Sequence, residues 1–224
     1  FNNLERYSEA LESYKKAIEL DSNSVQAWIS QGKAFGNLER YSEALESFKK
    51  AIELDSNSVE AWIVQAGTLS NLRKYEDALT AYNRAGEIDP KNHDMLNEQA
   101  LTLSFLKDFE KAIAAIDKAI SLEPQEVLLR ANRGIILARA GRYSEAIADC
   151  EQAIEQDSEH EVGYYGKACC YALQGKSEQA IDYLKKAIDI APRHSRIEAK
   201  HNPDFDSIRN YERFIALIYP ISEI

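Results

Sequence analysis

The chain has 224 residues, of which 29% are charged and 45% are hydrophobic, and its formal net charge at pH 7 is −10. That negative balance makes nucleic acid and anionic membrane surfaces poor candidates as partners, because like charges repel. No stretch approaches the roughly 18 consecutive apolar residues that a membrane-spanning helix needs, so we expect no membrane span.

A period of 34 residues organises the sequence from its first residues. Residues 2–24 read NNLERYSEALESYKKAIELDSNS, and residues 36–58 repeat them with two differences, at Asn2/Gly36 and Tyr14/Phe48. One alanine position recurs with the same offset through the chain, as Ala10, Ala44, Ala78, Ala112, Ala146 and Ala180. A fixed period of this length indicates an array of one supersecondary unit.

Each unit has the apolar spacing of two helices. Ala44, Leu45, Phe48 and Ala51 recur at three- and four-residue steps. Proline, Asp, Asn and Ser gather between the units, where they favour turns. In chain order, the pattern predicts second helices near 8–20, 42–54, 76–88, 110–122, 144–156 and 178–190. It predicts first helices near 25–38, 59–72, 93–106, 127–140 and 161–174. We expect a serine hydroxyl to cap several second helices, at Ser8, Ser42, Ser144 and Ser177.

Residues at set places of the unit carry a family resemblance. The unit from Val25 holds Trp28, Gln31, Gly32, Phe35, Ala44, Phe48, Ala51 and Ser56 at these places. The pattern resembles the tetratricopeptide repeat family, from which it departs at Gln31 and Ser56. The resemblance implies an all-α fold, a right-handed α-solenoid of antiparallel helix pairs. The small residues let helices approach closely, and the two tryptophans are expected to pack in the core.

The repeat register divides the chain into seven parts. The predicted parts are a partial unit at 1–24, complete units at 25–58, 59–92, 93–126, 127–160 and 161–194, and C-terminal capping helices with a tail at 195–224. Because the first helix of the opening pair is almost entirely missing, the sequence suggests a fragment of a longer array, and we predict self-association through this end.

The period breaks after Pro192. We predict a short helix near 195–201, a turn at Asn202-Pro203 and a last helix near 208–218, with the final residues, 219–224, either loose or docked elsewhere. Phe205, Ile208, Phe214 and Leu217 are expected to cover the apolar face of the last unit. This segment resembles the one that closes many bacterial, especially cyanobacterial, arrays of the same family.

The family resemblance also implies a binding surface, because first helices of the family line a concave groove. The corresponding places here predict a peptide-binding groove that consists of Gln26, Ile29, Lys33, Asn37, Glu60, Ile63, Asn71, Asp94, Asn97, Leu101, Phe105, Leu128, Ala131, Ile135, Arg139, Val162, Tyr165, Cys169 and Leu173. The N-terminal half of this set is mixed and polar, and the C-terminal half is mainly apolar. An exposed apolar stripe indicates a polypeptide partner, a second copy or the chain's own tail. The set lacks the cationic clamp with which some members of the family hold a C-terminal carboxylate.

The sequence contains no motif that indicates catalysis, metal binding or phosphate binding. The four histidines are isolated, and no HExxH, CxxC or phosphate-binding glycine loop occurs. Cys150 and Cys170 could be neighbours, and three cysteines without metal spacing favour a reducing cytoplasm. We therefore expect no enzyme activity, no metal and no cofactor.

The leading hypothesis is a protein-interaction scaffold that holds a peptide or amphipathic helix mainly by apolar contacts. The alternatives are a self-assembling structural array and a regulatory arm of a larger multidomain enzyme.

Overall fold

The computed structural model describes residues 2–220, with side chains from Arg6 onward, and its regular elements over that range are all helical. The predicted all-α repeat fold is confirmed. The chain separates into two compact units, Phe1–Leu106 and Lys107–Ile224. Residues 221–224 of the predicted tail lie outside the described residues.

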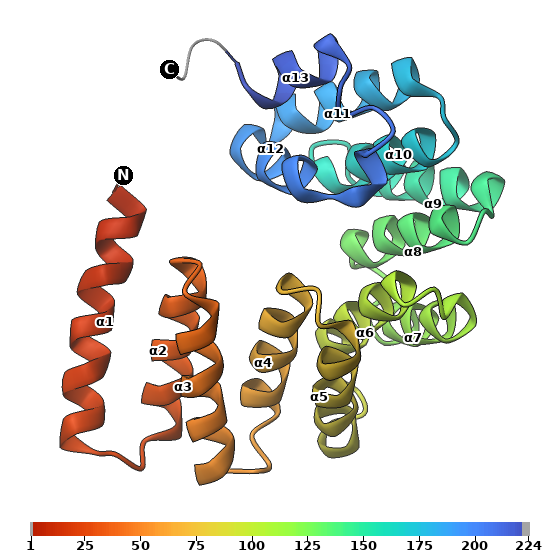
Figure 1. Ribbon diagram of the computed structural model, residues 1–224. Helices are drawn as coiled ribbons and strands as arrows, with labels where there is room; N and C mark the ends of the chain where they lie inside the picture. The colour runs from red at the N-terminus through yellow and green to blue at the C-terminus, as the bar shows by residue number, and fades with distance from the viewer. Residues whose placement is uncertain (1, 221–224) are drawn as a thin grey trace. The chain divides into compact units, whose positions relative to one another are not determined.

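Unit 1 consists of six helices whose neighbours in sequence pack on one another (Figure 1). They are α1 (Asn2–Leu20), α2 (Val25–Asn37), α3 (Tyr41–Leu54), α4 (Val59–Asn71), α5 (Tyr75–Ile88) and α6 (His93–Phe105). The first helices α2 and α4 also contact each other directly. This is the arrangement that a 34-residue helix-pair repeat requires, because each pair buries its apolar residues against its neighbours.

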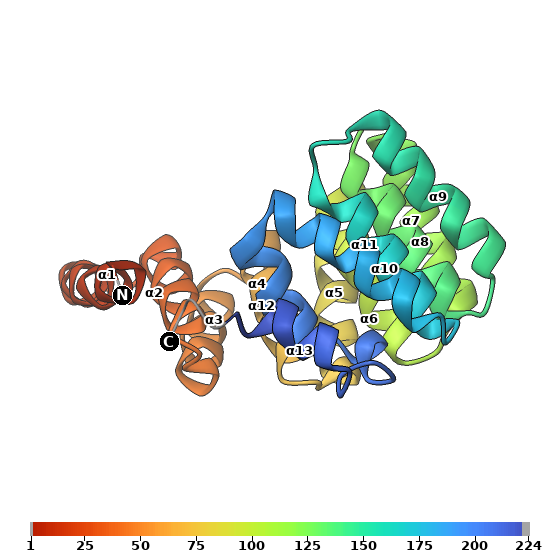
Figure 2. The same cartoon turned by 90° about the horizontal axis from the view of Figure 1, so that it is seen from above.

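Unit 2 continues the repeat and then departs from it. It consists of α7 (Phe109–Leu122), α8 (Val127–Arg139), α9 (Tyr143–Gln156), α10 (Glu161–Leu173), α11 (Ser177–Ile190), α12 (Pro192–His201), the 3₁₀ turn η1 (Pro203–Phe205) and α13 (Glu212–Ile218). Figure 2 shows α12 and α13 beside α11, and these three helices contact one another.

Most helix limits follow the predicted ranges closely, but α1 begins at Asn2 instead of residue 8 and α12 at Pro192 instead of residue 195. The predicted serine caps are wrong. Residue 39 adopts a left-handed conformation with φ of 59°, which ends α2 abruptly. The carbonyl of Arg40 then already accepts from the amide of Ala44, so α3 begins at Tyr41 and Ser42 lies inside its first turn. Side chains instead cap most first helices, where Ser24 and Ser58 each accept from the amide three residues later, and Asp108 caps the second helix α7.

The last helix also differs from its prediction. We expected a helix over 208–218, whereas α13 begins at Glu212. Residues 206–210 instead form turns, and the amide of Tyr211 donates to the carbonyl of Ile208. Pro192 follows the end of α11, as expected of a proline between units, and occupies the first turn of α12, where its missing N–H costs no hydrogen bond.

Small residues hold the helix pairs together. A Cβ atom added to Gly32 of α2 would lie 2.3 Å from the ring of Phe48 on α3, so the ring occupies the space that glycine leaves. In the same pair, Ala44 and Ala51 of α3 have no exposed surface. Close packing of this kind is sensitive to a single added methyl group.

The two tryptophans fasten the turns that precede their helices. Trp28 Nε1 donates to the carbonyl of Ser22, and Trp62 Nε1 donates to that of Ser56, both at 3.0 Å. Both indole rings are half-buried. They are therefore structural residues, although they lie at the edge of the core instead of inside it as predicted; Trp28 packs against the cluster of Ile29, Ala51 and Ala61.

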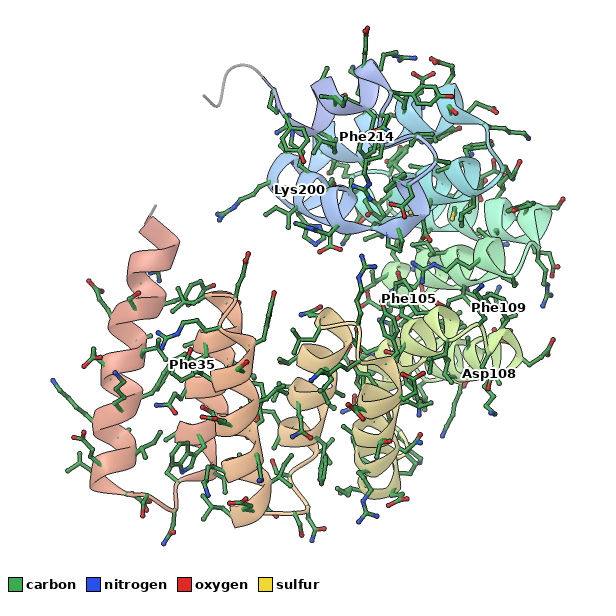
Figure 3. The ribbon with its side chains drawn as sticks, viewed as in Figure 1. Phe35, Phe105, Asp108, Phe109, Lys200 and Phe214 are labelled. Carbon is green, nitrogen blue, oxygen red and sulfur yellow. The ribbon has the colours of Figure 1, made fainter. Side chains whose placement is uncertain are left out.

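The C-terminal elements close the apolar end of unit 2. Phe205, Ile208 and Phe214 are at most 2% exposed and pack in one core cluster with Ile181 and Leu184 of α11. Figure 3 shows Phe214 among the side chains of this C-terminal part. The predicted covering role of these three residues is confirmed, and Leu217 packs against the same cluster.

Candidate functional site

In unit 1, the predicted binding positions form a mainly polar surface on α2, α4 and α6. The exposed side chains among them are Gln26, Lys33, Asn37, Glu60, Asn71 and Asp94. Lys33 and Glu60 pair between neighbouring first helices, with 2.5 Å from Lys33 Nζ to Glu60 Oε1. Both side chains are nearly half exposed, so the pair adds little stability and both charges stay accessible.

Apolar side chains accompany this polar surface of unit 1. The half-buried members of the predicted set are Ile63, Leu101 and Phe105. The ring of Phe105 stacks on that of Tyr75, with centroids 4.9 Å apart and planes 8° apart. Stacking fixes the orientation of the phenylalanine and leaves a partly apolar site beside the polar residues.

Three predicted positions belong to the core instead of the surface. Ile29 is 1% exposed and packs with Ala51 and Ala61. Asn97 is 4% exposed, and Ala131 is 1% exposed. The first helices turn these positions toward neighbouring helices, so their assignment to a binding surface is corrected.

In unit 2, the chain's own C-terminal segment lies on predicted binding positions. Leu128 stays exposed, and Val162 and Leu173 are half-buried. The positions that contact this segment, or share a buried cluster with it, are Ile135, Arg139, Tyr165 and Cys169. We call residues Asn202–Ile208 the docked segment. The sequence-based alternative in which the tail covers the apolar stripe therefore describes these four positions.

A buried ion pair anchors the docked segment. Arg139 Nη2 lies 2.9 Å from Asp204 Oδ2, and Arg139 Nε donates to both carboxylate oxygens, at 3.0 and 3.1 Å. The two side chains are only 10% and 5% exposed. A guanidinium and a carboxylate that form several hydrogen bonds in a site shielded from water fix both the position and the orientation of the docked segment.

Aromatic and amide contacts complete the docking. The ring of Phe205 meets that of Tyr165 edge to face, with centroids 5.6 Å apart. Asn202 Nδ2 donates to Tyr165 Oη at 3.1 Å and lies 3.6 Å from Cys169 Sγ. Ser207 Oγ donates to the carbonyl of Ala172 at 3.2 Å. Sequence reasoning identified the covering residues but not the charged pair between 139 and 204.

The thiols and phenols of this region are poor nucleophiles. Burial raises the pKa of the Tyr165 hydroxyl and of the Cys169 thiol well above their usual values. A hydrogen bond with Cys170, together with burial, raises the pKa of Cys150 in the same direction. Cys150 and Cys170 are thus neighbours, as their spacing suggested, and the thiol of Cys150 stays protonated near neutral pH.

Other clusters of charged residues are structural. Arg133 donates to both carboxylate oxygens of Asp149, at 2.6 and 2.7 Å, and reaches Asp117 at 2.9 Å. His194 Nδ1 lies 3.0 Å from Glu161 Oε1. Over residues 2–220, no group of three or more histidine, cysteine or acidic side chains is placed to hold a metal ion. Within the same range, no helix combines the length and apolarity that crossing a membrane would take.

Comparison with known proteins identifies the repeat. Profiles described as tetratricopeptide repeat match residues 25–58, 59–92, 105–162 and 162–194, and one described as TPR repeat matches residues 1–39. The chain belongs to the tetratricopeptide repeat (TPR) family. No curated protein sequence matches this TPR chain significantly.

Solved TPR structures resemble the chain over most of its length. YrrB, described as a TPR protein with an unusual peptide-binding site, is 27% identical, with 85% of this chain and 99% of YrrB covered and a TM-score of 0.59. MamA is 25% identical, with 68% and 90% covered and a TM-score of 0.61. A TPR protein from Parabacteroides merdae, 19% identical with 97% and 93% covered, has a TM-score of 0.71 and shows the fold alone.

Proposed function

We propose that this TPR chain is a non-enzymatic interaction scaffold whose unit 1 binds a polypeptide segment on the exposed first-helix surface of α2, α4 and α6. One observation carries the proposal: in unit 2, the first helices α8 and α10 already hold a polypeptide segment, residues 202–208. The peptide-binding description of YrrB, at 27% identity, supports the same function.

The repeat register relates the two surfaces position by position. Tyr165 occupies the place that Ile63 occupies in unit 1, because the two differ by three periods of 34 residues. Cys169 corresponds likewise to Leu101. Unit 1 therefore presents a half-buried apolar side chain at one copy of each of these two places, at Ile63 and Leu101.

The ligand of unit 1 differs in chemistry from the docked segment. Arg139 corresponds to Asn37 and Asn71, whose side chains are exposed, and to the half-buried Phe105. The carboxamide of asparagine both donates and accepts hydrogen bonds. It is therefore better suited to bind a peptide backbone than to bind a carboxylate ligand. We expect an extended peptide held by backbone contacts with asparagine, with one or two apolar side chains against Ile63 and Leu101.

Affinity follows from the number of anchors. Burying each apolar anchor contributes about 1.5–3 kcal/mol, and ordering the peptide offsets part of that gain. One or two anchors contribute at most about 6 kcal/mol before that cost, so we expect binding weaker than micromolar, which corresponds to about −8 kcal/mol. Such affinity is sufficient for an assembly whose partners exchange.

A capture experiment tests the proposal. Immobilised wild-type protein is compared with the double variant Ile63→Asp, Leu101→Asp, and peptides retained from a random-peptide display library are sequenced. We expect the variant to lose the enriched peptides. The control is Leu54→Asp, at a residue 40% exposed at the end of α3 and outside the proposed surface. Equal enrichment on the wild type and the double variant, with folding verified by circular dichroism, would exclude this surface.

A further inference from the structure

Unit 2 contains a cavity of about 250 Å³ between the second helices α7 and α9, where both pack on α8. Figure 2 shows these three helices next to one another. The apolar lining of the cavity comes from Ile113, Leu137 and Ala148. Two other lining side chains, Arg142 and Glu145, are about half exposed, so the cavity is open to solvent. A side chain from outside the unit can therefore enter it.

The following repeat shows which side chains fit this space. One period of 34 residues later, Tyr171 and Tyr183 occupy the places of Leu137 and Asp149, two residues that line the cavity. The ring of Tyr171 is 9% exposed and stacks on that of Tyr183, with centroids 5.4 Å apart. Two aromatic rings thus pack together at places where the cavity has a leucine, a carboxylate and open space.

Lysine side chains flank the Tyr171 ring. Lys167 Nζ and Lys176 Nζ lie 6.0 and 5.8 Å from its centroid. Arg133 and Arg142 occupy the corresponding places one period earlier, and both line the cavity. A cation near the face of an aromatic ring is attracted by the negative charge density of that face. The cavity therefore has the cations of this arrangement but lacks its ring.

Unit 1 contains a second example of the same arrangement. Phe35, labelled in Figure 3, occupies the place of Leu137 three periods earlier, and Arg40 occupies the place of Arg142. Arg40 Cζ lies over the ring of Phe35, 4.5 Å from its centroid. At this place of the repeat, an aromatic ring thus pairs twice with a cation five residues later. The repeat at 127–160 has the cation without the ring.

Ion pairs orient the two guanidinium groups of the cavity. Arg133 bonds to both carboxylate oxygens of Asp149, and Arg142 donates to Glu145 from Nε at 2.8 Å and from Nη2 at 2.6 Å. Such hydrogen bonds lie in the plane of a guanidinium, so they leave its faces for stacking on an aromatic ring. The cavity is thus preorganised to receive a ring, which lowers the entropic cost of binding.

Charge favours a basic segment as the source of this ring. Three acidic residues line the cavity, Asp117, Glu145 and Asp149, against two basic ones, Arg133 and Arg142. Lysine or arginine beside the aromatic residue of a partner is therefore attracted to this part of unit 2.

A second copy of the chain is a poorer source of the ring. Two copies repel each other, because each has a formal net charge of −10. Among the side chains that the structure describes, the exposed aromatic ones are Tyr211 and Tyr219. Lys200 Nζ already lies 5.6 Å from the ring centroid of Tyr219. These observations favour a different polypeptide as the occupant.

We propose that the cavity between α7 and α9 binds an aromatic side chain of a partner polypeptide, in a segment that also carries lysine or arginine. The ring contacts Ile113 and Leu137 and stacks on the guanidinium of Arg142. This inference goes beyond the proposed function, because it adds a contact site between the second helices of unit 2. The residues of that site are all different from those of the first-helix surface of unit 1.

Peptide titrations provide the test. The probes are two acetylated and amidated pentapeptides, Lys-Lys-Tyr-Lys-Lys and Lys-Lys-Leu-Lys-Lys. Binding to the ¹⁵N-labelled full chain is followed through the arginine Nε–H signals in NMR spectra. We expect saturable binding of the tyrosine peptide in the millimolar range, because a single anchor is buried. The leucine peptide should bind about two- to fivefold more weakly, because it has no ring to stack on a guanidinium.

Variants that fill the cavity locate the binding site. Leu137→Tyr introduces the side chain that Tyr171 has in the next repeat, and Ala148→Phe introduces a ring from an exposed position of α9. Each variant should abolish saturable binding of the tyrosine peptide. The matched controls are Leu128→Tyr, at a residue 36% exposed on α8, and Ala114→Phe, at an exposed residue of α7. Both control residues lie outside the cavity lining, so binding should not change. Circular dichroism verifies that each variant is folded.

Several results would overturn the proposal. They are the absence of saturable binding, equal binding of the two peptides, and binding that both cavity-filling variants retain. If 4-methylphenol, the isolated tyrosine side chain, binds as tightly as the tyrosine peptide, the ligand is a small aromatic molecule instead of a polypeptide. A light-scattering mass that doubles without probe and returns to the monomer in Leu137→Tyr would assign the cavity to a second copy. Ile63→Asp with Leu101→Asp should not affect the probes, so this test can fail independently of the peptide surface of unit 1.

Discussion

Removing the carboxylate of Asp204 should destabilise unit 2 by about 3–5 kcal/mol. Asp204→Ala leaves the guanidinium of Arg139, only 10% exposed, without its buried counter-ion, which costs about that much in other proteins. If the docked segment instead detaches so that water reaches Arg139, Phe205 and Ile208 lose their burial. That route costs about 1.5–3 kcal/mol for each side chain, so both routes give a similar loss.

Urea unfolding followed by far-UV circular dichroism measures this loss, and hydrogen exchange of residues 192–218 locates it. The control is Glu145→Ala, which removes an exposed partner of Arg142 and should cost at most about 1 kcal/mol. Replacing both partners by apolar residues, Arg139→Met with Asp204→Leu, should recover most of the stability. A loss below about 1 kcal/mol for Asp204→Ala, with exchange over 192–218 unchanged, would refute the anchoring role of the pair.

Three other predictions concern local conformation and reactivity. Gly175 has φ of 73°, so Gly175→Ala should lower the free energy of unfolding by about 1–2 kcal/mol. Gly36 lies in a helix with open space around it, so Gly36→Ala should raise the free energy of unfolding by about 0.5–1 kcal/mol. Thermal unfolding distinguishes the two variants. Ser58→Ala should cost about 0.5–2 kcal/mol through its lost cap, while Ser42→Ala should change unfolding free energy by less than about 0.5 kcal/mol. The three cysteines are fully buried, and raised pKa values at Cys150 and Cys169 keep both protonated, so Ellman's reagent at pH 8 should detect no rapidly reacting thiol until guanidinium is added.

Sequence periodicity was sufficient to predict the repeat and nearly all helix limits, because packing residues such as Ala44 and Ala51 recur at fixed places. Periodicity did not predict which residues cap the second helices. The residue with left-handed backbone before α3, at position 39, is not a glycine, so the sequence does not indicate how tight the turn is. The predicted cap, Ser42, is therefore the second residue of α3.

The candidate site was less predictable than the fold. Family positions on the first helices indicated which residues face a partner, but burial at Ile29 depends on contacts with α3 and α4 that periodicity does not encode. The pair of Arg139 and Asp204 joins residues 65 positions apart, outside the repeat register, so no internal copy pointed to it.

The two tryptophans provide an intrinsic fluorescence probe of unit 1. Both indoles of the chain lie in unit 1, at Trp28 and Trp62, and each bonds to the turn before its helix. Fluorescence excited at the red edge of the tryptophan absorption band thus reports on the first three repeats alone. Far-UV circular dichroism instead averages over all helices. Comparing the midpoints of the two signals reveals whether the halves melt as one cooperative block or in sequence.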